Sequence, residues 1–441
     1  MSEPIMPQRP PRESLAGWLG LNRTTVAVLV AIAGLGLSEE IWKNFFGIHL
    51  LELISGGALK DLQAIKPEQV TNAIFYLAVY AFFVNLAEGF GYIIGGTVAH
   101  RMGVRIALVV SAIPMLTGFS ILFIAENPWL KIVGALLLTN WEPLSVPATF
   151  EVVGSELPKN RRTIAFAMQS IQKRLPKVIG PLLGVAVFVT QGYWLNLTMA
   201  LAVLIISIVV QMSLLRKMKP KDEPSATPIR QVLRDMPTDL RMLLSAEIIL
   251  RWGDWFVRDF AAVYVVGVLL QSPRDYGFLA ALTAFIALIT YIPIAKLVDR
   301  APSPKPYIGL TFFLFAAFPF CLVLLPKIMP VMLALVIAFV VNGLRELGEP
   351  ARKAMIASGF PKEVRARAVG LYWGLRSFAF FPAPIVAYVF WKHFGPDWTF
   401  LAGGALGMLG VAWFWISVRC APTAGTSSQN ERMNTVHGID F

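Results

Sequence analysis

Long apolar stretches separated by short polar segments fill the sequence from about residue 24 to residue 418. Such stretches reach the length of about 20 residues that a helix needs to cross a bilayer core of about 30 Å. Charged residues, Gly or Pro bound each stretch, as is typical of helix ends. The pattern predicts about twelve membrane-spanning helices, at 24–52, 70–98, 104–125, 128–156, 162–190, 192–215, 240–270, 276–297, 306–326, 329–352, 364–391 and 397–418.

One longer polar segment interrupts this series and divides the spans into six and six. It covers residues 216–239 and is rich in Lys, Pro and acidic residues, which is typical of a linker rather than a span. We therefore predict an all-α membrane protein with 12 transmembrane helices in two six-helix bundles. The predicted segments are an N-terminal cytoplasmic segment at 1–23, bundles at 24–215 and 240–418, the cytoplasmic linker at 216–239, and a disordered cytoplasmic tail at 419–441.

Positive charges are distributed unevenly between the loops. One alternate set is rich in Lys and Arg, whereas the other holds few such residues, including Lys131, Lys327 and Lys392. The positive-inside rule places the rich set, and with an even number of spans both termini, in the cytoplasm of a bacterial inner (plasma) membrane. The rich set comprises Arg101, Arg105, Lys159, Arg161, Arg162, Arg216, Lys217, Lys219, Lys221, Arg300, Lys305, Lys353, Lys362, Arg365 and Arg367.

Composition argues against a soluble enzyme. Of the 441 residues, 56% are hydrophobic and 15% are charged, whereas a soluble domain carries about 25% charged residues. The loops account for the net charge of +12, so we expect no nucleic-acid partner. Cys321, Cys420 and the four histidines show no disulfide or metal-ligand pattern, and we expect no cofactor and no metal. The first apolar run is too long for a cleavable signal peptide and should remain as the first span.

The two halves also carry an internal repeat. Residues 147–181 and 350–384 align without a gap at a shift of 203 residues, and Lys173 then falls on Arg376. Several matched residues are Pro or charged, which a shared apolar composition does not explain. The identical pairs are Pro147 and Pro350, Ala148 and Ala351, Ser155 and Ser358, Pro158 and Pro361, Lys159 and Lys362, Arg162 and Arg365, Ala165 and Ala368, and Pro181 and Pro384.

Two related six-helix halves in parallel orientation are typical of the major facilitator fold. The segment from Gly96 to Arg105 resembles the short loop between spans two and three of that superfamily, with His100 at the usual Asp position. The second half has a partial copy that keeps Asp299 and Arg300. The resemblance implies a cytoplasmic latch between the halves, formed by Gly96, His100, Arg101, Gly103, Arg105, Asp299 and Arg300.

Gly180-Pro181-Leu182-Leu183-Gly184 in span five resembles part of the superfamily's antiporter signature, although Pro176 replaces its preceding Gly. This resemblance implies export of a small compound.

Charged residues inside the predicted spans are the best guide to function, because each costs roughly 2.5–3.5 kcal/mol to insert. In span seven, Glu247, Arg251, Asp254 and Arg258 form one helical stripe of alternating sign. The stripe should line a central cavity or an interface between the halves, and neighbours of opposite sign can pair. It either contacts the substrate or forms a charge network that holds one state closed.

Span one offers a candidate for proton coupling. Glu39 and Lys43 can pair four residues apart, which leaves Glu40 as the freer carboxylate, with Trp42 on the same turn. Burial favours the protonated form of a carboxylate, which suits proton uptake and release. We predict that Glu40, Glu142 and Asp254 couple protons, and the alternative is a permanent salt bridge.

Spans five, ten and eleven add further polar groups. Gln169, Gln172 and Lys173 share one face of span five, and Arg376 is the repeat partner of Lys173. Two such cations would attract an anion, unless Glu142 and Glu349 neutralise them. Arg345 and Glu349 should lie deep, and Arg352 should contact headgroups or the latch. The predicted cavity residues are Glu40, Trp42, Glu142, Gln169, Gln172, Lys173, Arg251, Asp254, Arg258, Arg345, Glu349, Trp373 and Arg376.

Four prolines, Pro176, Pro181, Pro382 and Pro384, should interrupt spans five and eleven, because proline removes a backbone hydrogen bond. Matched bends would suit rocking of one half against the other, although packing alone could also explain them.

These observations predict a secondary transporter that works by alternating access. Proton-coupled export of a small organic solute is the main interpretation. Organic-anion uptake, a lipid-precursor flippase and a non-transporting membrane sensor remain alternatives. A nucleotide-driven pump is disfavoured because the sequence has no Walker-type glycine loop. We expect a monomer whose partners are the lipid bilayer, the small-molecule substrate and protons.

Overall fold

The computed structural model describes residues 23–57, 59, 61–102, 104–139, 162–214, 234, 236–360 and 365–419. These residues form helices joined by short turns, and the described part of the chain contains no strand. The prediction of an all-α protein is therefore confirmed. Six helices in this part are long and apolar enough to span a membrane, within Pro67–Tyr92, Arg174–Ser213, Lys305–Lys327, Val331–Lys353, Ala368–Phe394 and Pro396–Ser417.

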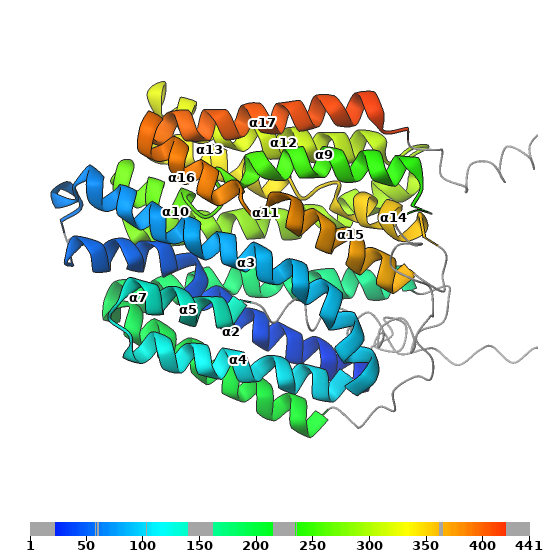
Figure 1. Cartoon of the computed structure of the whole chain (residues 1–441), viewed down its shortest axis with the longest axis horizontal. Helices are drawn as coiled ribbons and strands as arrows, with labels where there is room; N and C mark the ends of the chain where they lie inside the picture. The colour runs from blue at the N-terminus through cyan, green and yellow to red at the C-terminus, as the bar shows by residue number, and fades with distance from the viewer. Residues whose placement is uncertain are drawn as a thin grey trace, which may run out of the picture.

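The helices run along one long axis of the molecule, with the first half of the chain below the second half in Figure 1. The helices of the first half are α2 (Arg23–Ser55), α3 (Pro67–Met102), α4 (Val104–Ile124), α5 (Pro128–Thr139) and α7 (Arg162–Leu214). Those of the second half are α9 (Thr238–Trp255), α10 (Ala261–Val263), the π-helix Tyr264–Val268, α11 (Pro273–Arg300), α12 (Lys305–Leu324), α13 (Val331–Leu344), α14 (Glu349–Ser358), α15 (Arg365–Phe380), α16 (Ala383–Phe394) and α17 (Pro396–Ser417).

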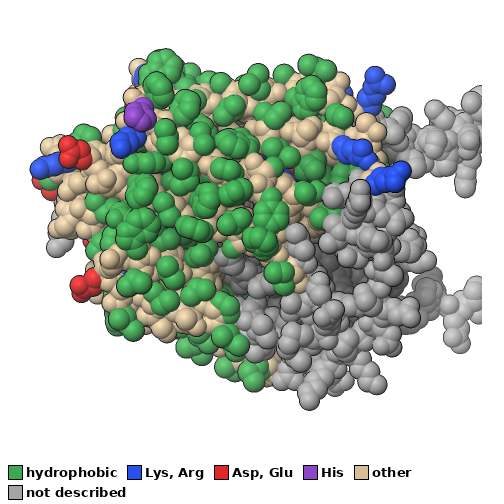
Figure 2. All heavy atoms as spheres, in the orientation of Figure 1, with side chains coloured by type: hydrophobic (Ala, Val, Ile, Leu, Met, Phe, Trp, Pro, Cys, Tyr) green, Lys and Arg blue, Asp and Glu red, His purple; other side chains and the backbone are tan. Residues whose placement is uncertain are grey.

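The two ends of this bundle are named here for later reference. The Gly56 end, at the left of Figure 1, holds the turn after α2 and the Gly395 turn before α17. The linker end, at the right, holds the end of α3 and the start of α9. On the face in Figure 2, hydrophobic side chains cover the middle of the described surface, and charged side chains gather near the two ends. Apolar side chains such as Ile124 and Trp194 are largely exposed, as lipid contact requires.

The sequence repeat extends into the backbone geometry. Gly192, at the turn inside α7, has φ 78° and ψ −177°, and Gly395, between α16 and α17, has φ 86° and ψ 173°. These residues are separated by the same shift of 203 residues as the repeat (395 − 192). Both turns need positive φ, which glycine adopts without the strain that a Cβ would impose.

Predicted and observed helix boundaries agree within a few residues for most spans. Residues 140–161, which include most of the predicted fourth span, lie outside the described residues. Two spans expected as single helices are broken. Span seven leaves helical geometry after Trp255 and resumes at Ala261, and span ten has a turn between Leu344 and Glu349. Such breaks free backbone groups, and in the second break Thr311 accepts a hydrogen bond from the N–H of Gly348.

The proline prediction is correct for only one of its two spans. Span eleven breaks between Phe380 and Ala383, next to Pro382. Helix α7 instead continues through Pro176 and Pro181, and its non-helical residue is Gly192. The expected interruption of span five is therefore wrong. Close packing against α2 holds α7 along this stretch, since Pro176 lies against Gly36 and Gly180 lies against Glu40.

A single apolar cluster closes the Gly56 end between the two halves. It contains Phe45 and Leu51 of α2 together with Val263 and Val266 of the second half. A Cβ on Gly267 would stand 3.1 Å from side-chain atoms of Leu51 and Val70, which leaves no space between the halves there. Nearer the linker end, α3 meets α15, where the rings of Tyr92 and Trp373 lie 5.6 Å apart. The halves are therefore in contact along α3, and their Gly56 ends are sealed.

Candidate functional site

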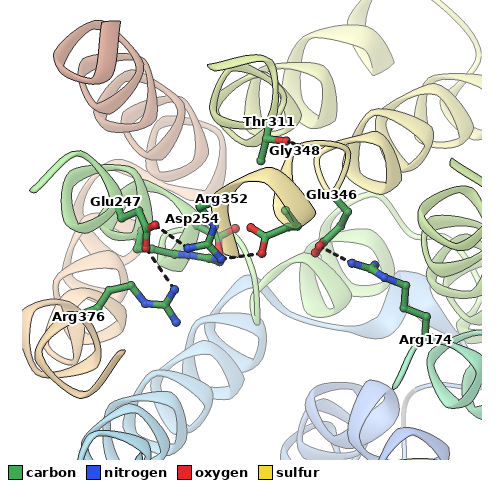
Figure 3. Close-up of polar contacts among 10 residues, drawn as sticks. Arg174, Glu247, Asp254, Thr311, Glu346, Gly348, Arg352 and Arg376 are labelled. Carbon is green, nitrogen blue, oxygen red and sulfur yellow. Dashed lines mark hydrogen bonds and ion pairs between the residues drawn. The ribbon is translucent and has the colours of Figure 1, made fainter. Parts of the chain in front are cut away.

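Charged side chains gather where the broken helices of the second half face one another (Figure 3). In the group that we call the Asp254 cluster, Asp254 pairs with Arg251 of the same helix at 3.1 Å and with Arg345 at 2.9 Å. Both guanidiniums also stack on Phe315 of α12, at 4.7 and 4.3 Å from the ring centre. The carboxylate is 4% exposed and each arginine side chain is 14% exposed. Two cations thus share one buried anion.

A second group, the Glu247 cluster, is more completely buried within the second half. Glu247 pairs with Arg352 of α14 at 2.7 Å and with Arg376 of α15 at 3.3 Å. Arg352 also pairs with Glu349 at 2.6 Å. Two carboxylates and two guanidiniums balance one another, and Glu247 and Arg352 are almost completely buried. Removing one member of a buried pair typically costs about 3–5 kcal/mol, so this cluster ties three helices of the second half together.

One ion pair joins the two halves directly. Arg174 of α7 reaches Glu346, in the break of span ten, at 2.8 Å (Figure 3). The same guanidinium lies 4.8 Å from the ring centre of Tyr291 on α11. The side chains are partly exposed, at 13% and 29%. A contact of this kind must be kept or broken whenever the halves change their relative orientation.

Helix α2 contributes the polar groups of the first half. Lys43 pairs with Glu39 at 2.7 Å, as the sequence predicted. The Glu40 carboxylate accepts a hydrogen bond from the Asn44 amide at 3.0 Å, and it makes no ion pair with a described residue. A Cβ on Gly180 would clash with the Cβ and backbone of Glu40, so the antiporter-like segment of α7 packs directly against α2 at this residue. The prediction that Glu40 is the freer carboxylate is therefore confirmed.

The last charge of the span-seven stripe stands apart. Arg258 lies in the turn after α9, its side chain is exposed, and its guanidinium lies 5.1 Å from the ring centre of Trp255. It makes no ion pair within the described part of the chain. Within the stripe, Arg251 and Asp254 pair with each other. Arg258 lies beyond the end of α9 at Trp255 and does not extend this pairing. Glu247 finds its partners on α14 and α15 instead.

Two expectations about span ten and span eleven are wrong. Arg352 was expected near headgroups or the latch, but it is buried in the Glu247 cluster. The break at residues 345–348 rotates α14 so that Arg352 faces α9. Arg376 was weighed as a free cation or as a partner of Glu349, and it instead pairs with Glu247. Glu349 has its own partner in Arg352.

The remaining predicted residues fall into two groups. Trp42 is fully buried against Phe46, and Trp373 packs on Tyr92 between the halves. Outside the described residues lie Glu142 and Gly103, and the side chains of Gln169, Gln172, Lys173, Gly96, His100, Arg101, Arg105, Asp299 and Arg300. The latch and the Lys173 side of the predicted cavity therefore remain predictions.

Sequence reasoning missed several residues of this region. Phe315, which orients two guanidiniums, lies in an apolar span with no polar signal. Arg174 and Glu346 were visible as charges within spans, but their pairing depends on a contact between halves that no local pattern encodes. The partners of Arg345, Glu346 and Arg352 depend on where span ten breaks, and the sequence did not predict that break.

Known proteins resemble this chain in sequence and in fold. A sequence profile of the Major Facilitator Superfamily matches residues 248–435. Among curated proteins, the Multidrug resistance protein MdtH of Salmonella typhi is 22% identical over 339 residues, which cover 76% of this chain and 79% of the relative. MdtH of Salmonella typhimurium matches with the same identity and coverage.

Solved structures share the fold over nearly the whole chain. A POT family transporter in complex with 5-aminolevulinic acid aligns with a TM-score of 0.71 at 14% identity, covering 92% of this chain and 97% of that one. The peptide transporter POT in complex with sulfate aligns with a TM-score of 0.68, also at 14% identity, covering 93% of this chain and 95% of that one. At this identity, the likeness concerns the fold.

An apolar helical fold with charged clusters at its broken helices, and an ion pair across its halves, is typical of membrane transporters rather than of enzymes. The profile over the second half, the relatives and the fold all point to the major facilitator superfamily, which this chain resembles.

Proposed function

We propose that this protein is a secondary active transporter that moves a small organic solute by alternating access, coupled to protons and in the direction of export. The observation that carries this proposal is the ion pair between Arg174 and Glu346, which joins the halves beside broken helices. Broken helices and charges near the interface of two repeats are typical of transporter binding sites. The sealed Gly56 end fits one of the two states that alternating access requires.

Export is supported by the curated relatives, since MdtH is a multidrug resistance protein. The contact of Gly180 with Glu40 supports coupling, because the antiporter-like segment packs against a residue whose carboxylate has no ion pair to a described residue. A carboxylate that changes its protonation during the cycle could link solute movement to a proton gradient. Asp254 and Glu142 stay further candidates for this role.

The topology follows from the charge distribution. We infer that the linker end lies in the cytoplasm of the bacterial inner membrane, with both termini, because the Lys- and Arg-rich loops belong to that end. Residues 24–215 and 240–418 then form the two bundles, 216–239 the linker, and 1–23 and 419–441 the terminal segments. We expect the working unit to be a monomer, since one chain supplies both halves.

Reconstitution tests the proposal directly. The purified chain in lipid vesicles, with the pH-sensitive dye pyranine inside, is given a panel of cationic, neutral and anionic organic compounds under an imposed pH gradient. We expect at least one compound to cause a proton flux above that of empty vesicles, together with its own gradient-driven movement. Solute movement that ignores the gradient would contradict proton coupling, and no movement of any compound would favour a sensor. A fluorescent-lipid flipping assay on the same vesicles separates the flippase alternative.

Organic-anion transport is the second candidate. It is supported by the Asp254 cluster, in which two guanidiniums share one carboxylate.

A further inference from the structure

A cavity of about 410 Å³ lies at the Gly56 end, where the first half meets α16 of the second half. It borders the apolar cluster that seals this end, because Ile54, Tyr76 and Tyr388 pack against that cluster. It is separate from the charge clusters described above, which share none of its residues. The cavity is lined by Ile54, Asn72, Phe75, Tyr76, Pro128 and Tyr388.

We propose that this cavity is an inhibitory site for an organic ammonium ion, which binds while the Gly56 end is sealed and holds the two halves in that state. The inference rests on the proposed alternating access and adds a second site to it. The occupant of this site is a ligand that slows the cycle, and not the transported solute.

Aromatic rings form the walls of the cavity. The ring centre of Phe75 lies 5.5 Å from that of Tyr76 and 5.1 Å from that of Tyr388, with the ring planes inclined at 62° and 58°. Trp129 packs against two of these rings, at 5.8 Å from Phe75 and 5.1 Å from Tyr76. Rings inclined at such angles surround a space instead of stacking flat. Aromatic cages of this kind recognise quaternary ammonium ligands.

The lining favours a cation over an anion. None of the described lining residues is charged, so an anion would find no positive charge to pair with there. The faces of aromatic rings carry partial negative charge and attract a cation. The oxygen atoms of Asn72, Tyr76 and Tyr388 can also accept a hydrogen bond from an ammonium N–H. Lys131 of α5 is buried, and its ammonium group donates to the carbonyl oxygen of Leu122 at 2.8 Å.

The size and position of the cavity suit a small organic ion. Its volume lies within the range of about 300–1,000 Å³ that is typical of small-molecule sites. Asn72 is exposed, so the cavity is accessible from the surface at this end. Ile54 and Pro128 offer contacts to the apolar groups of such an ion.

Both halves contribute to the site, which makes binding depend on the state of the protein. Phe75 belongs to α3 of the first half and Tyr388 to α16 of the second, and these helices lie side by side (Figure 1). When the halves separate at the Gly56 end, Tyr388 moves away and the site loses one wall. A ligand shifts an equilibrium toward the state that it binds more tightly. An ion held between Phe75 and Tyr388 therefore favours the sealed state.

Direct binding to the detergent-purified full chain tests the site without any transport step. The probe is benzyltrimethylammonium, compared with neutral benzyl alcohol and anionic benzoate, which share its ring. Calorimetry gives the affinity, and tryptophan fluorescence reports the site, because Trp129 contacts two lining rings. We expect saturable binding of the cation, about tenfold tighter than that of benzyl alcohol, and no binding of benzoate. No binding of the cation, or equal binding of the three compounds, would overturn the proposal.

Ring-removing variants assign the binding to this cavity. Tyr388→Leu and Tyr76→Leu should each weaken cation binding about tenfold, whereas Tyr388→Phe keeps the ring and should retain most of the affinity. The matched control is Trp398→Leu, which removes a ring from a second cavity of about 430 Å³ lined by apolar side chains of α16 and α17. It should leave the affinity unchanged. Thermal unfolding midpoints identify any variant that is not folded. Unchanged affinity in both leucine variants would overturn the assignment.

Spin labels test the effect on the halves. Asp61→Cys and Arg274→Cys place one label on each half, at exposed positions of the Gly56 end. In lipid nanodiscs, saturating benzyltrimethylammonium should raise the ratio of the short to the long distance several-fold, and Tyr388→Leu should abolish this effect. A ratio that falls or stays the same while the cation is bound would overturn the inhibitory role.

Failure of the site and failure of the proposed function are distinguishable. Two distances whose shares change with pH but not with the bound cation would overturn the inhibitory role and leave alternating access in place. A single distance under all conditions would contradict alternating access, while cation binding that the leucine variants weaken would still establish the site.

Discussion

The environment of Glu40 illustrates what a single side chain contributes to this fold. Its neighbour Glu39 is neutralised by Lys43, whereas the Glu40 carboxylate accepts a hydrogen bond from the Asn44 amide. A neutral amide donor stabilises a carboxylate less than a full positive charge does. Among the described residues, Glu40 therefore has an amide and not a cation as its side-chain partner.

If Glu40 carries the coupled proton, Glu40→Gln should lower gradient-driven flux at least tenfold, because glutamine cannot take up or release a proton. Exchange of labelled solute across vesicles without a gradient should remain. The matched control is Glu126→Gln, at an exposed position at the Gly56 end, which should keep full gradient-driven flux. Gradient-driven flux that survives in Glu40→Gln would exclude Glu40 as the coupling group.

Arg352 plays a different role, since both of its partners are buried carboxylates of the same half. Arg352→Gln would leave Glu247 and Glu349 short of positive charge, and breaking such a pair costs about 3–5 kcal/mol. We expect a marked fall in the thermal unfolding midpoint. Lys392→Gln, at an exposed position in the last turn of α16, should change the midpoint little, because exposed charges contribute about 0–1 kcal/mol. An unchanged midpoint for Arg352→Gln would show that the Glu247 cluster does not stabilise the half.

For single residues, the sequence located the charged side chains within the predicted spans. It also correctly predicted the ion pair between Glu39 and Lys43, which lie four residues apart. It could not predict that Arg376 pairs with Glu247 and not with Glu349, because the three residues lie on three different helices. Long-range pairing depends on how the helices pack, which periodicity along one helix does not contain.

Helix contacts and helix breaks set these pairings at the scale of whole elements. Gly180 and Gly184 let α7 touch α2 at Glu40 and Ile41, and Gly253 lets α9 touch the backbone of α17 at Gly403. Small residues at such positions bring helix axes close together. The breaks after Trp255 and Leu344 then direct Arg258, Arg345 and Glu346 away from the regular helix faces.

Substituting Gly180 should disturb the α2–α7 contact, because a Cβ there would stand 2.9 Å from the carbonyl carbon of Glu40 and closer still to its Cβ. We expect Gly180→Ala to lower both the thermal unfolding midpoint and the gradient-driven flux. Gly36→Ala is the matched control on the same pair of helices, since its nearest atoms are 3.5 Å away on Pro176. Equal behaviour of the two variants would argue against close packing at Gly180.

The sequence predicted most helix boundaries, because changes from apolar to polar residues mark them. It did not predict the breaks of spans seven and ten, because residues 256–260 and 345–348 contain no proline. Proline was a poor guide, since Pro176 and Pro181 lie within a continuous α7 while Pro382 lies at a break. Tertiary contacts, such as that of Gly348 with Thr311, decide which helix opens.

The whole molecule is two related halves that meet along α3 and close at the Gly56 end. The repeat predicted this organisation, and the matched turns at Gly192 and Gly395 extend it into the backbone. The contact between Arg174 and Glu346 crosses from one half to the other and belongs to neither repeat alone. The strength of this ion pair should therefore change the relative populations of the transport states more than the stability of either half.

Exchanging these two charges tests that idea. Arg174→Glu and Glu346→Arg alone place like charges opposite each other and should each lower flux several-fold. The double exchange restores opposite charges and should recover part of the flux. Thermal unfolding midpoints check that the single variants remain folded. A double variant no better than the worse single variant would show that the pair is not a functional contact between the halves.

The central claim, that the two halves alternate about this charged region, is tested most directly by a distance across the Gly56 end. Spin labels are placed at Asp61→Cys in the first half and Arg274→Cys in the second, both exposed, in a chain with Cys321→Ala and Cys420→Ser. In lipid nanodiscs, the account predicts a short distance for the sealed state and a second, longer distance whose share changes with pH or a transported compound. A single distance that stays the same under all these conditions, in protein that still transports, would contradict alternation of the halves.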